Sequence, residues 1–379
     1  MRIGIDARIL AYPKCGISTY VYNLVRNLLK INKDLKIFLF SDSEFDIQYD
    51  FSFLPIQKVV FATRKKEKKK WAQRFLPYKL KEYKIDVYHA TWNNSVPFLR
   101  SCPCVLTIHD LAPWVLGGHF KNKRKEIRYK LRQFFCAQWA DVIITVSYRS
   151  KQDIIKLCKV KENKVKVIYL GLDEEFKSRV DEKISKEVLN KYNLLNKRYL
   201  INPVGIDHPR RNSLLVLRGF HEFLKISNQD FYLVYTGNFY KDGKEYKNLI
   251  EKIRMRGLEN RVIVTGWVPT QDLKVLLSYA TISVIPSLYE GFGLPILESF
   301  ACRVPVIATK RGAIPEVAQD AAVLIEPTDY KNLASQIRML IEDEGRRKYY
   351  VTKGRERLGL FDWRKAAEET LKIYKQLLK

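Results

Sequence analysis

The chain has 379 residues, of which 46% are hydrophobic and 29% are charged. This composition is typical of a folded globular protein and excludes a disordered chain, and the length exceeds that of a single small module. The formal net charge of +27 indicates an anionic partner, namely nucleic acid, an anionic membrane face or a phosphorylated substrate.

The N-terminal sequence MRIGIDARIL carries Asp6 and Arg8 where a signal peptide needs an unbroken apolar core. No run of about 18 apolar residues, the length that spans a bilayer, occurs elsewhere in the sequence. We therefore expect a cytoplasmic protein that does not span a membrane. The six cysteines fit no disulfide framework and show no C-x-x-C spacing, so we expect reduced thiols.

Apolar runs of strand length recur along the chain and alternate with helical patterns. The runs are RIGIDA, KIFLFS, KVVFAT, DVYHAT, CVLTIHD, VIITVS and KVKVIYL, and then YLINPVG, FYLVYTG, VIVTGWV, ISVIPS, VPVIAT and AAVLIE. Continuous Val/Ile-rich runs followed by helices predict parallel strands that are buried on both faces. Since a polar stretch, residues 171–193, separates the two series, the sequence predicts two α/β domains. Open parallel sheets bind ligands at the carboxyl ends of their strands, so two facing sheets would form one interdomain cleft.

We place the N-terminal domain at residues 1–172 and the C-terminal domain at residues 173–360. The last segment, residues 361–379, contains a helical pattern with no strand after it. We expect this helix to cross back to the N-terminal domain.

Two stretches of the N-terminal half combine clustered cations with apolar residues. Residues 63–84 contain Lys66, Lys68, Lys69, Lys70 and Arg74 beside Trp71, Phe75, Leu76 and Leu80, and residues 120–135 place Ile127, Leu131, Phe134 and Phe135 at helical spacing opposite cations. Such faces suit amphipathic helices that lie on anionic lipid. They equally suit solvated cationic faces above a stripe that packs into the core, and the pattern leaves both interpretations open.

The most informative segment is IPSLYEGFGLPILESFACRVPVIATKRGAIPEV, residues 285–317. A predicted strand is followed by a glycine-containing loop and by a helix with Pro295 in its first turn. The unpaired amides near Gly293 and Leu294, together with the helix dipole, predict a site for a phosphate or diphosphate. Glu298, about one turn into the helix, can accept hydrogen bonds from both hydroxyls of a ribose, and Glu290 would face the group beyond the phosphates. The alternative is that Glu298 only complements the helix N-terminus and that Glu290 is solvated.

These residues resemble the family 4 glycosyltransferases, which are retaining, nucleotide-sugar-dependent enzymes of the GT-B architecture. The segments TIHDL, IITVSYRSKQDI, VIYLGLDEEF, PVGIDHPRRNSLLVLRGF, VTGWVP and FDWRKAAEETLKIY are similar to segments of this family, in its order and across nearly the whole chain. The similarity is greatest to mannosyltransferases and related enzymes of lipopolysaccharide and polysaccharide assembly. It implies two Rossmann-like parallel-sheet domains facing an interdomain cleft. It also implies transfer of a hexose, with mannose as the first expectation, to a glycan or lipid-linked glycan.

The resemblance implies three catalytic residues, Glu290, His109 and Arg211. Glu290 would position the sugar or stabilise positive charge at the anomeric carbon, and His109 would contact the donor sugar from the N-terminal domain. Arg211 stands where the family has a lysine and would hold the diphosphate as a bidentate donor. The implied substrate-binding residues are Glu298, Gly291, Phe292, Gly293, Leu294, Gly16, Arg210, Gly266, Val268 and Asp110.

Some of these positions differ from the family or have an ambiguous role. Gly16-Ile17-Ser18-Thr19-Tyr20 stands where the family has Gly-Ile-Gly-Arg-Tyr, so the first glycine is kept while the second glycine and the arginine are lost. Gly266 and Val268 resemble the loop that holds the nucleobase through backbone groups. Asp110 would either orient His109 or cap the next segment.

No Asp-x-Asp sequence occurs, so we expect no metal requirement and no cofactor besides the nucleotide-sugar donor. The expected partners are this donor, a glycan or a polyprenyl- or lipid-linked acceptor, and an anionic membrane surface, but not nucleic acid. The expected location is the inner face of the membrane. The alternatives are a nucleotide-sugar epimerase or a phosphorylase on a similar scaffold, and a basic nucleic-acid-binding protein, although no helix-turn-helix, zinc-ligand or RRM-like signature accompanies the charge.

Overall fold

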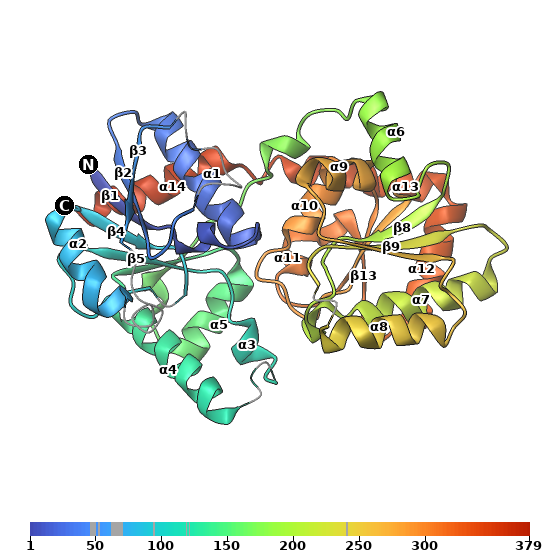
Figure 1. Cartoon of the computed structure of the whole chain (residues 1–379), viewed down its shortest axis with the longest axis horizontal. Helices are drawn as coiled ribbons and strands as arrows, with labels where there is room; N and C mark the ends of the chain where they lie inside the picture. The colour runs from blue at the N-terminus through green and yellow to red at the C-terminus, as the bar shows by residue number, and fades with distance from the viewer. Residues whose placement is uncertain are drawn as a thin grey trace. The chain divides into compact units, whose positions relative to one another are not determined.

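The structure is a computed structural model that describes residues 1–45, 51, 54–61, 71–93, 95–118, 120, 122–239 and 242–379. Contacts within the chain divide it into two units. The N-terminal unit consists of Met1–Gly171 and Asp362–Lys379, and the C-terminal unit consists of Leu172–Phe361 (Figure 1).

The N-terminal unit is built on a parallel sheet of seven described strands in the order β3-β2-β1-β4-β5-β6-β7. The two central strands β4 and β5 are buried at every residue, as expected for parallel strands covered on both faces. The strands are β1 (Arg2–Asp6), β2 (Lys36–Ser41), β3 (Ile56–Val60), β4 (Val87–Ala90), β5 (Cys104–Ile108), β6 (Val142–Thr145) and β7 (Val165–Val167).

The helices of the N-terminal unit include one from the far end of the chain. The α-helices are α1 (Gly16–Ile31), α2 (Leu76–Glu82), α3 (Ala112–Val115), α4 (Lys123–Trp139), α5 (Tyr148–Cys158) and α14 (Trp363–Gln376), and further helical segments are Arg8–Ala11, Trp71–Phe75 and Glu162–Lys164. Helix α14 packs against α1, and Figure 1 shows the two side by side. A Cβ atom on Gly171 would lie 2.3 Å from the Trp363 backbone nitrogen, so the start of α14 requires glycine at this point of close approach.

The C-terminal unit is built on a parallel sheet of six described strands in the order β10-β9-β8-β11-β12-β13. The strands are β8 (Tyr199–Asn202), β9 (Tyr232–Thr236), β10 (Val262–Gly266), β11 (Ile282–Ile285), β12 (Val306–Thr309) and β13 (Ala322–Ile325). The helices are α6 (Glu182–Lys191), α7 (Ser213–Ile226), α8 (Lys244–Arg254), α9 (Thr270–Ser278), α10 (Leu294–Ala301), α11 (Ile314–Ala318), α12 (Tyr330–Glu342) and α13 (Glu344–Leu358), with short helical segments at Glu174–Phe176, Pro209–Arg211 and Gln319–Ala321.

The sequence-based prediction of two parallel-sheet α/β domains is confirmed. Every one of the thirteen apolar runs contains or overlaps a strand, and the largest shift is at the edge strand β3, which begins two residues before its run. The six cysteines are free thiols, of which Cys104, Cys136 and Cys158 are buried.

Each sheet reverses its strand order at one point. In the N-terminal sheet the reversal lies between β1 and β4, and in the C-terminal sheet it lies between β8 and β11. In open α/β sheets, the loops that leave the carboxyl ends of the strands at such a point form the binding crevice. The residues to examine are therefore those that follow β1, β4 and β5 in one unit, and β8 and β11 in the other.

Candidate active site

The loops that follow β8 and β11 bring Arg211 and Glu290 into contact. Arg211 ends the short helix Pro209–Arg211, and its Nη1 donates to Glu290 Oε1 at 2.7 Å, across 79 residues of sequence. Ser287 Oγ donates to the same oxygen at 2.7 Å. The side chains are mostly buried, with Arg211 21% and Glu290 12% exposed. Two predicted catalytic residues thus form one partly buried ion pair.

One donor of this arginine is unused within the described part of the chain. Arg211 Nε is buried and has no hydrogen-bond partner there, because Asp207 Oδ1 lies 3.7 Å away. Buried polar groups normally have partners, so an orphan guanidinium N–H is a feature that needs explanation. An oxygen atom of an anionic ligand would satisfy it.

The backbone of Glu290 is held by a neighbouring loop. The Ala313 amide donates to the Glu290 carbonyl at 2.9 Å. Gly312 has φ +58°, and a Cβ atom there would lie 2.5 Å from the Glu290 carbonyl oxygen and 2.7 Å from its amide nitrogen. Only glycine fits this position, because it supplies both the left-handed backbone and the space. On the other side, the Leu288 amide donates to the Arg210 carbonyl at 2.8 Å.

Helix α10 begins where the sequence predicts, directly after Gly293. Gly293 is its N-cap with φ +108°, and Pro295 lies in the first turn. As a glycine, the N-cap residue has no side chain with which to cap the first amides of the helix, and free amides at a helix start are a favourable site for an anion. Glu298 lies one turn further along and is half-buried, while Gly291 and Phe292 are buried in the preceding loop.

The loops after β8, β9 and β10 pack on one another through glycines. The Gly205 amide donates to the Thr236 carbonyl at 3.0 Å, and the Gly237 amide donates to the Gly266 carbonyl at 2.9 Å. A Cβ atom on Gly237 would lie 2.7 Å from the Gly205 nitrogen, so the first two loops are in backbone contact. Val268, two residues after Gly266, is buried.

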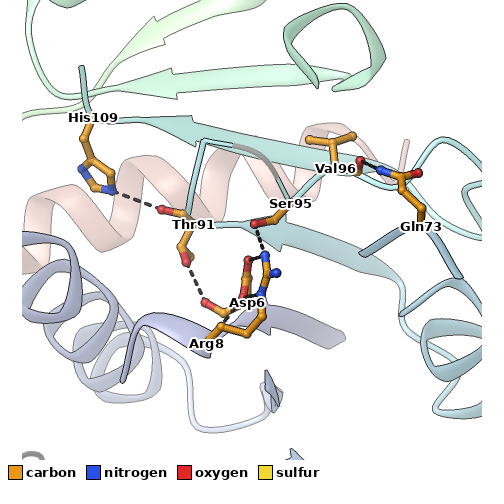
Figure 2. Close-up of polar contacts among 7 residues, drawn as sticks. All are labelled: Asp6, Arg8, Gln73, Thr91, Ser95, Val96 and His109. Carbon is orange, nitrogen blue, oxygen red and sulfur yellow. Dashed lines mark hydrogen bonds and ion pairs between the residues drawn. The ribbon is translucent and has the colours of Figure 1, made fainter. Parts of the chain in front are cut away.

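The carboxyl ends of β1, β4 and β5 carry a second polar cluster (Figure 2). His109 follows β5 and its Nε2 lies 3.2 Å from the Thr91 carbonyl, while Thr91 Oγ1 donates to the Asp6 carbonyl at 2.6 Å. Arg8 Nη2 donates to Asp6 Oδ2 at 2.8 Å and also donates to Ser95 Oγ. These bonds join three loops around the predicted histidine.

The environment of His109 determines its charge and its tautomer. Burial lowers the pKa of His109 to about 4, although the bond to Thr91 and the charge of Asp110 act in the opposite direction. Because a backbone carbonyl only accepts hydrogen bonds, Nε2 carries the proton and Nδ1 keeps its lone pair. At neutral pH the ring is therefore an uncharged hydrogen-bond acceptor at Nδ1.

Asp110 and Gly16 occupy helix starts. Asp110 lies one residue before Leu111, the N-cap of α3, and its Oδ1 accepts from the Ala112 amide at 2.9 Å. Gly16 is the exposed first residue of α1. Ser18, which replaces the family's second glycine, is buried and accepts from the Cys15 amide at 2.8 Å. A serine here thus contributes to the start of α1.

Sequence reasoning missed a buried hydrogen-bond chain behind His109. Tyr374 of α14 bonds to His89 Nδ1 at 2.5 Å, His89 Nε2 bonds to Thr107 Oγ1 at 2.7 Å, and Tyr20 OH bonds to Thr107 at 3.0 Å. The Tyr20 ring meets the His109 ring edge-on at 4.8 Å between centroids. The chain joins α14, β4, β5 and α1. The sequence signal was weak, since a histidine inside the run DVYHAT was the one indication.

We expect acid to destabilise the N-terminal unit through its buried histidines. Burial lowers the pKa of His89 to about 3 and that of His109 to about 4, below the ordinary value near 6.5 of the unfolded chain. Between those values the unfolded state binds more protons, so stability rises with pH there and is lost as pH falls below about 6.5. Between pH 7 and pH 5, each histidine should lower the free energy of unfolding by about 2 kcal/mol. Urea unfolding at both pH values measures this.

The control for this pH dependence is His89→Gln, which cannot be protonated. Its free energy of unfolding should fall about 2 kcal/mol less than that of the wild type between pH 7 and pH 5. Equal losses in the two proteins would contradict the assignment.

The two parallel sheets both have a Rossmann-like strand order. At the switch point of the C-terminal sheet lie the Arg211–Glu290 pair and a helix that starts at a glycine. This architecture is that of a GT-B-type transferase. A family model described as "Glycosyltransferase Family 4" matches residues 15–176, and one described as "Glycosyl transferases group 1" matches residues 184–357. The chain belongs to the glycosyltransferases of family 4 and is a glycosyltransferase enzyme.

Similar proteins are also glycosyltransferases. The chain is 26% identical to O-antigen chain mannosyltransferase B of Escherichia coli over 397 residues, covering all of both chains. It is 26% identical to O-antigen chain mannosyltransferase RfbU of Salmonella typhimurium over 248 residues, covering 65% of this chain and 63% of the relative. The solved structure of Anabaena Alr3699/HepE in complex with UDP-glucose matches 99% of this chain and 100% of that one, with a TM-score of 0.79 and 19% identity, which supports the fold.

In the described ranges, no helix is both long and apolar enough to cross a bilayer.

Proposed function

We propose that this enzyme transfers a hexose, with mannose as the first choice, from a nucleotide-diphosphate sugar to a glycan or lipid-linked glycan, with retention at the anomeric carbon. The role would lie in cell-surface polysaccharide synthesis. The observation that carries the proposal is the Arg211–Glu290 pair in the loop that leads to the glycine N-cap of α10. The names of two relatives, both O-antigen chain mannosyltransferases, support mannose.

The leaving diphosphate is the group whose charge the enzyme must neutralise. In the described part of the chain, Arg211 has a buried Nε–H without a hydrogen-bond partner, 3.7 Å from Asp207 Oδ1, and the N-cap of α10 is a glycine that has no capping side chain. Fixed donors of this kind stabilise negative charge that develops on the phosphate oxygens as the anomeric C–O bond breaks. We therefore assign the diphosphate to Arg211 and to the amides of Gly293 and Leu294, without a metal ion.

Glu290 and Glu298 would serve different parts of the donor. Glu290 is fixed by Arg211 and Ser287, so it would stabilise positive charge at the anomeric carbon or position the sugar. Glu298 would accept hydrogen bonds from the ribose hydroxyls. The acceptor hydroxyl attacks from the face that the diphosphate leaves, and the leaving phosphate oxygen takes its proton, which gives retention.

His109 would act as a neutral residue. Its pKa near 4 keeps the imidazole uncharged at pH 7, and its Nδ1 lone pair is suited to accept a hydrogen bond from a sugar hydroxyl. We place the acceptor on the N-terminal unit and the enzyme at the inner face of the membrane.

Glu298→Ala is expected to weaken donor binding, because it removes the acceptor for the ribose hydroxyls. The measurement is a thermal-shift screen in EDTA against GDP-mannose, UDP-glucose, UDP-galactose, UDP-N-acetylglucosamine and UDP-N-acetylgalactosamine. A donor at about 100 times its dissociation constant should stabilise the wild type by about 2.7 kcal/mol. The matched control Glu259→Ala removes an exposed carboxylate of the same unit and should keep the full shift.

Product analysis then separates the reaction classes. Release of a nucleoside diphosphate with formation of a glycoside shows transfer, whereas an isomerised nucleotide sugar would show an epimerase. A wild type that no donor stabilises, with or without magnesium, would refute the donor site. A shift that Glu298→Ala retains would refute the ribose assignment alone.

A further inference from the structure

Helix α4 (Lys123–Trp139) presents three large apolar side chains to solvent. Ile127, Leu131 and Phe135 are 57%, 52% and 44% exposed, and they lie one above another at i, i+4 and i+8. The residues that the helix buries are Gln133, Cys136 and Ala137. Of the four residues in the stripe predicted from the sequence, Ile127, Leu131 and Phe135 therefore do not pack on the core, and Phe134 is half-buried.

The stripe continues onto a neighbouring loop. Phe98 and Leu99, in the loop between β4 and β5, are 62% and 68% exposed. The Phe98 ring meets the Trp139 ring edge-on at 5.0 Å, and Phe135 stacks on Trp139 at 5.6 Å between centroids. We call Phe98, Leu99, Ile127, Leu131 and Phe135 together the α4 face. An exposed apolar cluster of this kind marks an interaction surface rather than scattered surface residues.

Cations lie on both sides of the stripe. Helix α4 contains six cationic residues and one acidic residue, a net charge of +5, and its acidic residue Glu126 pairs with Lys130. By helical geometry, Lys123 and Lys130 lie on one side of the stripe and Arg128 and Arg132 on the other. Long cationic side chains beside an apolar stripe can reach lipid headgroups while the stripe enters the acyl boundary.

The other basic stretch has a different arrangement. Trp71, Leu76 and Leu80 are buried and belong to the core cluster of the N-terminal unit. This stretch therefore uses its apolar residues for folding, and Lys66, Lys68, Lys69 and Lys70 lie outside the described residues. Among the described residues of the two stretches, it is α4 that has an exposed row of large apolar side chains.

We propose that the α4 face binds the surface of an anionic lipid bilayer, with Ile127, Leu131 and Phe135 inserted among the headgroups and the flanking cations on lipid phosphates. Charge complementarity favours an anionic bilayer over a second copy of this protein, because two helices of net charge +5 repel each other. Figure 1 shows α4 alongside α5, against which it packs, so the fold holds the face in a fixed orientation. The inference deepens the proposed membrane location but needs no donor-site residue.

The test is co-sedimentation of the full chain with vesicles of phosphatidylcholine alone or with about a third phosphatidylglycerol. Wild type should sediment with the anionic vesicles and hardly with the neutral ones, and high salt should release it. The triple variant Ile127→Gln/Leu131→Gln/Phe135→Gln should bind at least tenfold more weakly, because the inserted apolar area is lost. The charge variant Lys123→Gln/Arg124→Gln/Arg128→Gln should lose binding to a similar degree.

The matched control is Ile184→Gln/Met255→Gln/Leu360→Gln, which removes three similarly exposed apolar side chains from the C-terminal unit. It should sediment like the wild type. The α4 variant should keep the thermal shift that the donor induces, which shows that its fold and donor site are intact. Loss of membrane binding can therefore be told apart from loss of the proposed transferase function. The proposal would be overturned if the wild type did not bind anionic vesicles or if the α4 variant bound them like the wild type. A wild-type dimer that is lost in the α4 variant would also overturn it.

Discussion

Replacing Arg211 by alanine is expected to lower the rate of sugar transfer by two to three orders of magnitude. Loss of one fixed donor to a developing negative charge costs about 100- to 1,000-fold in other enzymes. Here the change also leaves Glu290, which is 12% exposed, without its ion-pair partner. Steady-state kinetics with the donor found in the thermal-shift screen measures the loss.

Two further variants separate the two roles of Arg211. Arg211→Lys keeps the positive charge but loses the planar guanidinium that can donate two parallel hydrogen bonds. We therefore expect a transfer rate between those of the wild type and Arg211→Ala. Arg211→Ala/Glu290→Ala removes Glu290 together with its partner, and the coupling energy from the double-mutant cycle reports the pair itself. If Arg211 also holds the diphosphate, the double variant should bind free nucleoside diphosphate more weakly than Glu290→Ala does. Arg218→Ala, an exposed position on α7, is the control, and transfer by Arg211→Ala within threefold of wild type would contradict the role.

Gly312→Ala is expected to abolish most of the activity while touching no ligand. Its new Cβ atom would lie 2.5 Å from the Glu290 carbonyl oxygen and 2.7 Å from its amide nitrogen, and both are backbone atoms that cannot rotate away. The Glu290 loop must shift, and with it the carboxylate that Arg211 and Ser287 hold. A displacement of about 1 Å in a catalytic group can cost 100-fold in rate.

Gly257→Ala supplies the control for the backbone conformation. Gly257 has φ +63°, close to the φ +58° of Gly312, but a Cβ atom there would have no neighbour within 4 Å among the described residues. Urea unfolding should show a loss of about 1 kcal/mol for Gly257→Ala, from the left-handed backbone alone. Gly312→Ala should lose about 3 kcal/mol, since steric overlap adds to that cost. Equal stability losses with normal transfer in both variants would show that Gly312 does not hold the loop.

Local patterns were sufficient for the elements of this fold. The Val/Ile-rich runs predicted the thirteen described strands, because a parallel strand that is covered on both faces is apolar along most of its length. Gly293 and Pro295 predicted the start of α10 for a similar reason, since a left-handed N-cap residue and a first-turn proline are local backbone requirements. These features depend on neighbours in sequence.

Contacts between distant segments could not be predicted in the same way. The sequence placed Arg211 at a diphosphate and Glu290 at a sugar, but the 2.7 Å bond between them depends on β8 and β11 being neighbours in the sheet. Sheet order and helix docking likewise determine three other contacts. These are the close approach of Gly312 to the Glu290 backbone, the bond from His109 to the Thr91 carbonyl and the bond between Tyr374 and His89.

Helix α4 shows the same division within one element. The sequence by itself determined that Ile127, Leu131 and Phe135 share a helix face, because 3.6 residues per turn is a local property. Only the tertiary structure decided that this face meets solvent while Gln133, Cys136 and Ala137 pack inward. Helical periodicity tells which residues lie together, whereas burial depends on which neighbouring elements cover them.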